Sequence, residues 1–450
     1  MNALNRKLMR DIWRLRGQVL AIALVVASGV AVLVMSLSAL EALVETSEAY
    51  YERYRFADVF AGVKRAPDNL ARRIATIPGV QTVETRIAKF AILDIEGFAE
   101  PVIGRLTSIP EGGEPLLNQL ALREGRLVEP GRPDEVVLSE PFAEAHGFKP
   151  GDRIAAIIND TKRSLSIVGI ALSPEFVYAI GPGALMPDDK RFGVLWMGRE
   201  ALAAAYDLDG AFNDVTLSLL PGVEPVSVID RLDLLLERKG GVGAIERADQ
   251  ISNWFLVDQL NQLKTMATVL PAIFLGVAAF LTNMVLARLI ATERSEIGLL
   301  KAFGYSHLQV GWHYAKMVMV MTAVGIVIGW LAGAWLGRFN TQLYAEFYRF
   351  PFLLYRPSPS AFVIAALVSL AAALAGTLGA VRRAAALPPA EAMRPPAPPI
   401  YRKTRISKSR LALWLDQLTR IILRQIIRWP VRAGLTSTGV ALAIGVLIMT

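Results

Sequence analysis

Four long stretches of uncharged, apolar sequence constrain this chain more than any other feature. They cover residues 17–40, 265–287, 317–337 and 357–381, and none contains Asp, Glu, Lys, Arg or His. A helix needs roughly 20 apolar residues to cross the hydrocarbon core of a bilayer, so each stretch is predicted to be a transmembrane helix. A fifth uncharged run, 433–450, ends with the sequence and is predicted to be the start of another span in a longer protein.

The overall composition agrees with a membrane protein, because 53% of the residues are hydrophobic and the mean hydropathy is +0.40. The chain has no cysteine, which excludes disulfides, thiolate metal sites and a cysteine nucleophile. It also lacks a GxxxxGK[ST] phosphate loop, a GxSxG elbow, a metal-ligand cluster and any nucleic-acid motif. The sequence therefore predicts a protein without catalytic residues that binds no cofactor, no metal and no nucleic acid.

The distribution of Lys and Arg predicts the orientation of the spans. Residues 1–16 hold five basic residues, and residues 382–432 hold twelve against two acidic ones. Short loops rich in Lys and Arg stay in the cytoplasm, where they also meet anionic lipid head groups. With alternating spans, 288–316 is cytoplasmic too, while 41–264 and 338–356 lie outside.

The predicted outside segment 41–264 has the length of an ordinary domain. A strand–helix–turn–strand pattern occurs at 57–97 and again at 213–248, and the two copies are predicted to pack as one α/β lobe. Between them, residues 124–172 alternate in short segments separated by Gly, Pro and Asp, which is typical of a small β-rich insert.

Two further segments of this domain carry a structural prediction. The helical periodicity of the first and second spans continues at 41–55 and 251–270, which predicts a helical stalk. Residues 173–197 are unusually rich in aromatic residues, Met, Pro and Gly. They form either a loop packed over the β-rich insert or a surface for an apolar substrate or a partner protein.

The N-terminal segment has a counterpart near the end of the sequence. Residues 4–14 align without gaps with residues 418–428, and three arginines at four-residue spacing coincide. This spacing is typical of an amphipathic helix on the cytoplasmic leaflet, and each copy precedes an uncharged run. The match predicts a duplicated unit. The alternative is that any basic helix before a span has this pattern.

The loop 288–316 contains the stretch ATERSEIGLLKAFGYS, residues 291–306. Its periodicity predicts a short amphipathic helix with Ile297, Leu300 and Gly304 on one face, and Gly304 is also a plausible end of that helix. From composition alone, a connector helix resting on lipid is the favoured explanation of the pattern.

This stretch resembles the signature of the FtsX-like permease family of ABC transporters, the MacB and lipoprotein-release group. The family's loop reads approximately R-x-E-I-G-I-L-[RK]-A-[LF]-G. The matching residues are Arg294, Glu296, Ile297, Gly298, Leu300, Lys301, Ala302 and Gly304. A second stretch, AAALPPAEAMRP, resembles the family's Pro-x-Glu-Ala-Leu-Arg ending after the fourth span. Its matching residues are Pro389, Glu391, Ala392, Met393 and Arg394, with Met393 in place of Leu.

The resemblance implies an α-helical membrane bundle of four spans, with the start of a fifth, and a large extracytoplasmic mixed α/β domain on a helical stalk. It places the chain in the bacterial inner membrane, with the N-terminus in the cytoplasm and the large domain in the periplasm. The loop would be a coupling helix that docks on a separate ATP-binding subunit, present in two copies, which binds ATP and Mg²⁺. The residues it implies for docking are Glu296, Ile297, Gly298, Leu300 and Gly304, with Arg294 and Lys301 as polar contacts.

The implied function is that of a permease that couples ATP hydrolysis to motion of the outside domain and to export or extraction of an apolar or amphiphilic substrate. A periplasmic adaptor is a further candidate partner. The alternative from another class is mechanotransmission, in which the same motion activates an external cell-wall enzyme or signals a sensor kinase. The family pairs two four-span bundles, so we expect a second half in the same longer chain or a homodimer.

Overall fold

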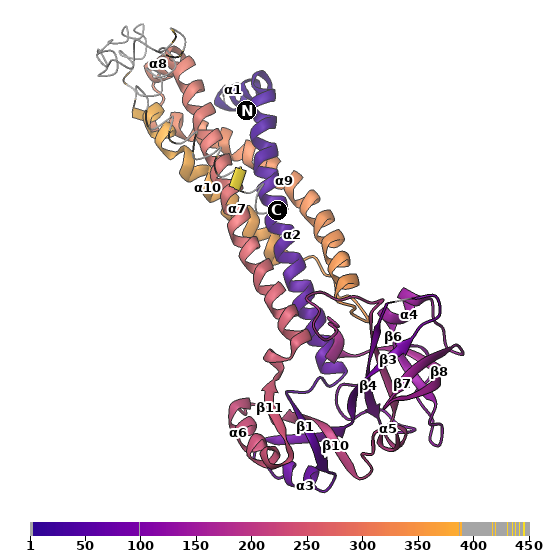
Figure 1. Cartoon of the computed structure of the whole chain (residues 1–450). Helices are drawn as coiled ribbons and strands as arrows, with labels where there is room; N and C mark the ends of the chain where they lie inside the picture. Colours follow the sequence, from indigo (N-terminus) through magenta and orange to yellow (C-terminus); the bar gives the residue numbers. More distant parts are fainter. Residues whose placement is uncertain are drawn as a thin grey trace. The chain divides into compact units, whose positions relative to one another are not determined.

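The computed structural model describes residues 3–98 and 100–386, together with isolated positions after 387 (Figure 1). The sequence motif at 389–394 and the uncharged run at 433–450 lie outside the continuously described part. The chain divides into two compact units. A helical unit is formed by Met1–Ala39, Lys264–Arg338 and Pro357–Thr450, and an α/β unit by Leu40–Leu263 and Phe339–Arg356.

Six helices supply the described part of the helical unit. They are α1 (Ala3–Arg14), α2 (Arg16–Arg53), α7 (Ile251–Thr292), α8 (Arg294–Ala302), α9 (His307–Phe347) and α10 (Pro359–Ala386). Four of them, α2, α7, α9 and α10, are long enough and apolar enough to span a membrane. The predicted stalk segments are helical, because α2 and α7 each run as one helix through residues of both units.

A row of glycines brings two helices of this unit into close contact. Gly325, Gly329 and Gly333 follow one another at four-residue spacing along α9 and face α2. A Cβ atom added at Gly329 would lie 2.6 Å from the Cβ atom of Val30, closer than two side chains can approach. Small residues at this spacing are how helices in a membrane gain van der Waals contact without a hydrophobic driving force between them.

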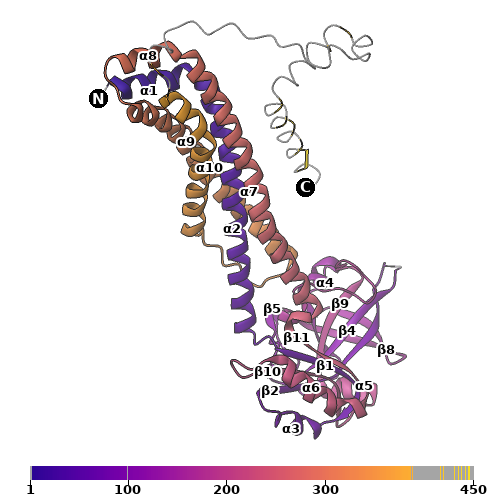
Figure 2. The ribbon, with the colours of Figure 1, turned by 90° about the vertical axis from the view of Figure 1, so that its left-hand side faces the viewer.

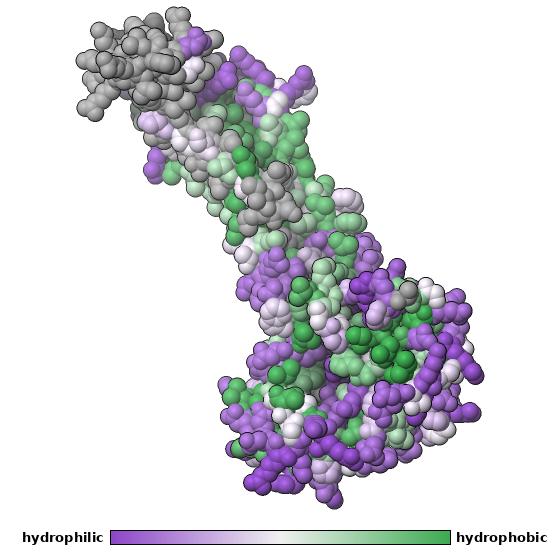
Figure 3. All heavy atoms as spheres, viewed as in Figure 1, coloured by the Kyte–Doolittle hydropathy of each residue, from purple (hydrophilic) through white to green (hydrophobic). Residues whose placement is uncertain are grey.

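The exposed surface of the helical unit is apolar, as it is in a protein that faces lipid. Leu331, Trp335 and Leu367 are each more than half exposed. Figure 3 shows hydrophobic residues along the outside of these helices.

The smaller sheet of the α/β unit has the strand order β11-β1-β10-β2, with every neighbouring pair antiparallel. Its strands are β1 (Val59–Pro67), β2 (Val80–Arg86), β10 (Ala211–Leu219) and β11 (Gly241–Glu246). Helices α3 (Leu70–Ile74) and α6 (Pro225–Leu236) bury their apolar residues against it in one core. The two predicted strand–helix–strand units therefore form one lobe.

The larger sheet has seven strands in the order β5-β8-β6-β9-β4-β3-β7. They are β3 (Ala88–Asp94), β4 (Val102–Ile109), β5 (Ala121–Gly125), β6 (Glu135–Ser139), β7 (Arg153–Ile158), β8 (Thr161–Leu172) and β9 (Phe192–Gly198). Since β7 also pairs with β8, six strands close into a barrel, and β5 extends it at β8. Helices α4 (Glu140–His146) and α5 (Arg199–Tyr206) pack against the barrel core.

The barrel is larger than the predicted insert, and it corrects one predicted strand. The alternating run at 81–97 is not one strand but two, because β2 belongs to the smaller sheet and β3 to the barrel. The change occurs at Ile87, which is fully buried and donates its N–H to Ser108 Oγ at 2.8 Å. The alternation of apolar residues continues through this junction, so periodicity alone does not reveal it.

Candidate functional site

The helix α8 carries the motif that the sequence singled out, and its end is set by a glycine. The N–H of Gly304 bonds to the carbonyl of Lys301 at 3.0 Å, and the N–H of Tyr305 bonds to the carbonyl of Leu300 at 3.2 Å. Gly304 has φ +91°, a conformation that glycine adopts without steric cost. This is the Schellman arrangement of a helix end, and it ends α8 where the sequence predicts.

The motif residues of α8 divide between an inner and an outer face. Ile297 is fully buried and Gly298 is buried, and Ile297 belongs to a core that also contains Leu286 of α7 and Tyr314 of α9. Leu300 is half-buried. Ile297 and Gly298 therefore lie on the face of α8 that packs against the rest of the helical unit, and neither is exposed to a partner protein in this structure.

The outer face of α8 and its end combine the motif residue Glu296 with apolar residues that the sequence motif did not emphasise. Leu299 and Phe303 lie four residues apart and are 50% and 75% exposed, and Leu308 at the start of α9 is 85% exposed. Glu296 is half exposed on the same helix. The i, i+4 spacing of Leu299 and Phe303 is the signal that could have identified this face from the sequence.

The two basic residues of the motif occupy the border between the faces. Lys301 donates from Nζ to the carbonyl oxygen of Ala385, near the end of α10, at 2.7 Å. Arg294 is half-buried at the start of α8. Lys301 thus ties α8 to the end of the last described helix.

The N-terminal helix α1 joins this site through a charged cluster. Helix α1 runs beside α8 (Figure 2). Lys7 Nζ lies 2.7 Å from Asp11, 2.9 Å from Glu293 and 3.0 Å from Glu296. Glu293 also accepts a hydrogen bond from the hydroxyl of Tyr314 at 3.0 Å. Burial by itself lowers the pKa of Lys7, but these carboxylates more than offset it, so the pKa of Lys7 lies above its ordinary value.

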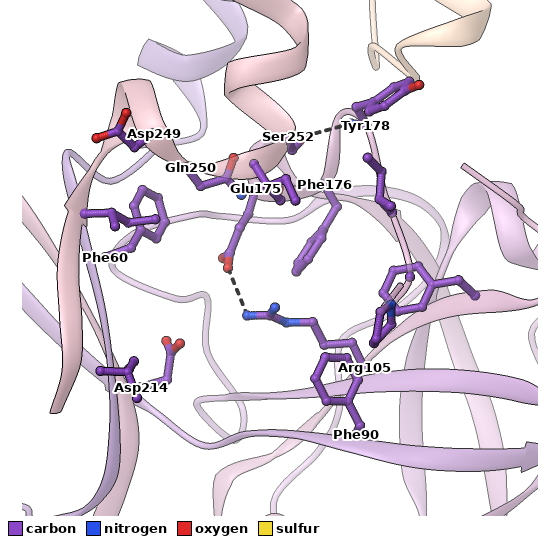
Figure 4. A pocket seen from close by; sticks show the side chains of 18 of the residues that line it. Phe60, Phe90, Arg105, Glu175, Phe176, Tyr178, Asp214, Asp249, Gln250 and Ser252 are labelled. Carbon is purple, nitrogen blue, oxygen red and sulfur yellow. Dashed lines mark hydrogen bonds and ion pairs between the residues drawn. The ribbon is translucent and has the colours of Figure 1, made fainter. Parts of the chain in front are cut away.

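A second candidate site is a cavity of about 640 Å³ in the α/β unit. Strands of both sheets line it, together with residues 175–184 and the first turn of α7 (Figure 4). The charged residues that line its floor are Arg105, Glu175 and Asp214, and Arg86 pairs with Glu175 and Asp214 behind the lining. Sequence reasoning missed this set, because its members are up to 128 residues apart.

The ion pairs at this floor are buried and well formed. Arg86 donates to Glu175 at 2.6 and 3.1 Å and lies 2.7 Å from Asp214. Asn118 Nδ2 donates to the same carboxylate at 3.2 Å. Burial alone would raise the pKa of Glu175, but Arg86 outweighs it and holds the pKa below its ordinary value.

Two family models match this chain. The model of the FtsX-like permease C-terminal matches residues 268–389, which include α8. The model of the MacB-like periplasmic core domain matches residues 19–234, which include most of the α/β unit. The chain belongs to the FtsX-like permease family. Within this permease, α8 and its contacts with α9 and α10 fall in the FtsX-like segment, and the charged cavity floor falls in the MacB-like segment.

A curated relative and two solved domains are similar to this FtsX-like permease. An uncharacterized ABC transporter permease protein of Mycobacterium tuberculosis is 25% identical over 293 residues, which cover 63% of this chain and 31% of that protein. The chain thus matches about a third of the relative's length. The periplasmic region of MacB from Actinobacillus actinomycetemcomitans is 14% identical with a TM-score of 0.29, and covers 46% of this chain and 95% of its own. The extracellular domain of the transporter YknZ from Gram-positive bacteria is 12% identical with a TM-score of 0.29, and covers 42% and 98%.

The segment 173–197 of this permease is partly packed and partly exposed. Glu175 and Tyr178 are buried, and the N–H of Tyr178 donates to Ser252 Oγ at 2.7 Å. Leu185 and Met186 are 88% and 67% exposed. The first part of the segment therefore supports the cavity, and residues 182–186 border open solvent. Residues 192–197 do not belong to a loop, because they form most of the buried strand β9.

The second sequence motif and the possibility of a metal site remain to be placed on the structure. Pro389, Glu391, Ala392, Met393 and Arg394 of the second motif lie outside the described residues. Within the part of the chain that the structure describes, no group of His, Asp and Glu is arranged to hold a metal ion.

Proposed function

We propose that this permease couples ATP hydrolysis by a separate ATP-binding subunit to motion of its α/β unit, and so exports or extracts an apolar or amphiphilic substrate. Its family of ABC transporter permeases supports this, as does the lack of a phosphate loop in its own sequence. The observation that carries the proposal is the exposed pair Leu299 and Phe303 on α8.

The outer face of α8 has the composition of a docking surface. An exposed Phe on a short helix gains free energy when a partner buries it, because apolar area contributes about 25 cal/mol per Å² removed from water. Phe303 is the most exposed of the large apolar side chains on α8, and Leu299 lies one turn before it. Glu296 at the edge supplies a polar contact. In this proposal Leu299, Phe303 and Glu296 meet the ATP-binding subunit.

The buried motif residues have a different role in this proposal. Ile297 and Gly298 seat α8 on α7 and α9, and Lys301 ties it to α10. Packed side chains resist compression, so displacement of α8 passes to the three helices that it contacts. Ile297, Gly298 and Lys301 thus transmit the motion, while Arg294, Leu300 and Gly304 keep the shape and position of α8.

The proposed function includes an orientation in the membrane and a set of partner subunits. The α8 end of the helical unit faces the cytoplasm and the α/β unit faces the periplasm of a bacterial inner membrane, as the distribution of basic residues favours. Two ATP-binding subunits, which hold ATP and Mg²⁺, serve a pair of permease halves, either in one longer chain or as a homodimer. A periplasmic adaptor completes the path where the substrate leaves the cell envelope.

The test replaces the outer face of α8 and leaves its seat intact. The double variant Leu299→Ser, Phe303→Ser should bind its ATP-binding subunit roughly 100-fold more weakly, since truncated anchor residues commonly cost 1–2 kcal/mol each. Its thermal unfolding should match that of the native chain. Leu185→Ser, an equally exposed apolar residue of the α/β unit, is the control and should bind normally.

A second variant distinguishes the packing of α8 inside the helical unit from the binding of α8 to the ATP-binding subunit. Ile297→Ser should lower the unfolding temperature of the permease in detergent, because a buried apolar side chain is lost. Native affinity for the ATP-binding subunit in the Leu299→Ser, Phe303→Ser variant would overturn the proposed surface.

A further inference from the structure

We propose that the cavity of the α/β unit binds an amphiphile with an acidic oxygen head group, and that Arg105 holds this head group. The inference deepens the proposed function by naming a site and a ligand class. Binding of the ligand does not depend on the proposed function. Only the later export or extraction of the bound ligand rests on it.

The walls of the cavity suit the apolar part of such a ligand. Its volume of about 640 Å³ lies in the range of small-molecule sites. Phe60 and Ile245 come from the smaller sheet, Phe90 from the barrel, and Phe176 and Ile180 from the segment after β8. Phe90 is 52% exposed although it borders a concave surface. Removing such side chains from water favours an acyl or aromatic group.

Arg105 supplies a hydrogen-bond donor that the described residues leave unused. Its Nε atom is buried and has no hydrogen-bond partner among the described residues. Its Nη2 atom lies 3.7 Å from Glu175 Oε1, longer than a hydrogen bond. The guanidinium lies over the ring of Phe176, 5.3 Å from its centroid, and points into the cavity (Figure 4). A buried donor without an acceptor costs free energy, so a ligand oxygen that accepts a hydrogen bond from Arg105 would remove this cost.

The other charges at the floor explain why Glu175 does not satisfy Arg105. Both oxygens of Glu175 are already engaged by Arg86, and Arg86 also pairs with Asp214. Arg86 and Arg105 balance the charges of Glu175 and Asp214, so these four residues present no net negative charge to an anion, and the Nε atom of Arg105 can donate to it. Asp249 lies at the rim, where it is exposed to water and its charge is screened.

The planar fork of an arginine matches a carboxylate or a phosphate equally. The ligand class is therefore a single-chain amphiphile that ends in either group. A fatty acid and a lysolipid phosphate are the two sources of this chemistry, and the probes below distinguish them.

The experiment uses the full chain in lipid nanodiscs, with no ATP-binding subunit present. Because the sequence contains no cysteine, Ala184→Cys at the cavity edge can carry one environment-sensitive fluorophore. The probes are decanoate, decyl phosphate, decanol and acetate. We expect a saturable response to decanoate, decyl phosphate or both, with decanol and acetate at least about tenfold weaker. The tighter of the two acidic probes identifies the source.

Variants assign the head group to Arg105. Arg105→Gln should weaken the acidic probe at least about tenfold and leave decanol unchanged, because a charge-assisted hydrogen bond is lost. Arg132→Gln, an exposed arginine outside the cavity, is the matched control and should bind as the parent does. Arg105→Lys keeps the charge without the fork and should lose part of the affinity, which provides a readout if Arg105→Gln folds poorly.

Three results would overturn the inference: no saturable response to either acidic probe, an affinity for decanol equal to that for the tighter acidic probe, or native affinity for that acidic probe in the Arg105→Gln variant. Binding at equilibrium needs no ATP-binding subunit. A negative result with the probes would therefore not contradict the proposed α8 docking surface. Likewise, a negative result with the α8 variants would not contradict the proposed ligand site.

Discussion

Lys7 Nζ lies 2.9 Å from Glu293 Oε2, although the two residues are 286 positions apart in the chain. The contact fixes the N-terminal helix α1 against the junction of α7 and α8. Both side chains are about one tenth exposed, so water screens the pair little. An apolar face of α1 that includes Leu8 packs into the same unit. The N-terminal helix thus belongs to the support of α8, in addition to any contact with lipid.

Lys7→Met should destabilise the helical unit by about 2–3 kcal/mol, because among the described residues it leaves the buried carboxylate of Glu293 with only the hydrogen bond from the Tyr314 hydroxyl. Thermal unfolding in detergent measures this. Arg10→Met, which removes an exposed charge from the same helix, is the control and should unfold as the native chain does. Equal unfolding temperatures for Lys7→Met and native protein would show that the cluster contributes nothing.

Glu175 predicts how the stability of the α/β unit depends on pH. Its pKa in the folded state lies below the ordinary value of 4.5, so its ionised form stabilises the fold at neutral pH. This contribution is fully present above about pH 4.5 and is lost as the pH falls from there through the lower folded-state pKa.

Glu175→Gln measures that contribution directly. At pH 7 the variant should be less stable than the native chain by about 3 kcal/mol, since Arg86 loses one of its buried partners. The difference between the two proteins should shrink as the pH is lowered below 4.5, and buffer effects on other groups cancel in the difference. A difference in the free energy of unfolding between the native chain and Glu175→Gln that stays constant from pH 7 to pH 3 would contradict the ion-pair explanation.

Gly329→Ala should destabilise the helical unit although alanine favours helices. The new methyl group would lie 2.6 Å from the Cβ atom of Val30, so α2 and α9 must separate, at a cost of about 1–3 kcal/mol. Gly276→Ala is the matched control in α7, because a Cβ atom there meets nothing within 4 Å. It should leave the unfolding temperature unchanged or raise it by the helix propensity gained. A comparison of the two unfolding curves decides between packing and propensity.

Single cysteines test the proposed orientation. Leu185→Cys in the α/β unit and Leu308→Cys after α8 replace side chains that are 88% and 85% exposed, in a chain without cysteine. In intact spheroplasts, a membrane-impermeant maleimide should label Leu185→Cys alone. Leu308→Cys should react only after the membrane is opened. The reverse pattern would invert the orientation.

Several features follow from the sequence alone because they depend on local chemistry. Uncharged runs of more than 20 residues must avoid water along their whole length, and they became the long apolar helices α2, α7, α9 and α10. The two strand–helix–strand units and the glycine end of α8 were likewise predictable, since periodicity and positive φ are properties of short segments. The repeated glycines of α9 were visible in the sequence, but their partner helix was not.

The tertiary structure decided which residues meet. Ile297 and Leu299 stand two positions apart in one motif, yet packing against α7 and α9 buries the first and leaves the second exposed. Lys7 and Glu293 become neighbours, and Arg105 opens into a cavity, only because distant segments fold together. Sequence patterns specify the polarity of each face of a helix or strand. The partner of that face depends on the packing of segments that are remote in the chain, and so does the position of each candidate site.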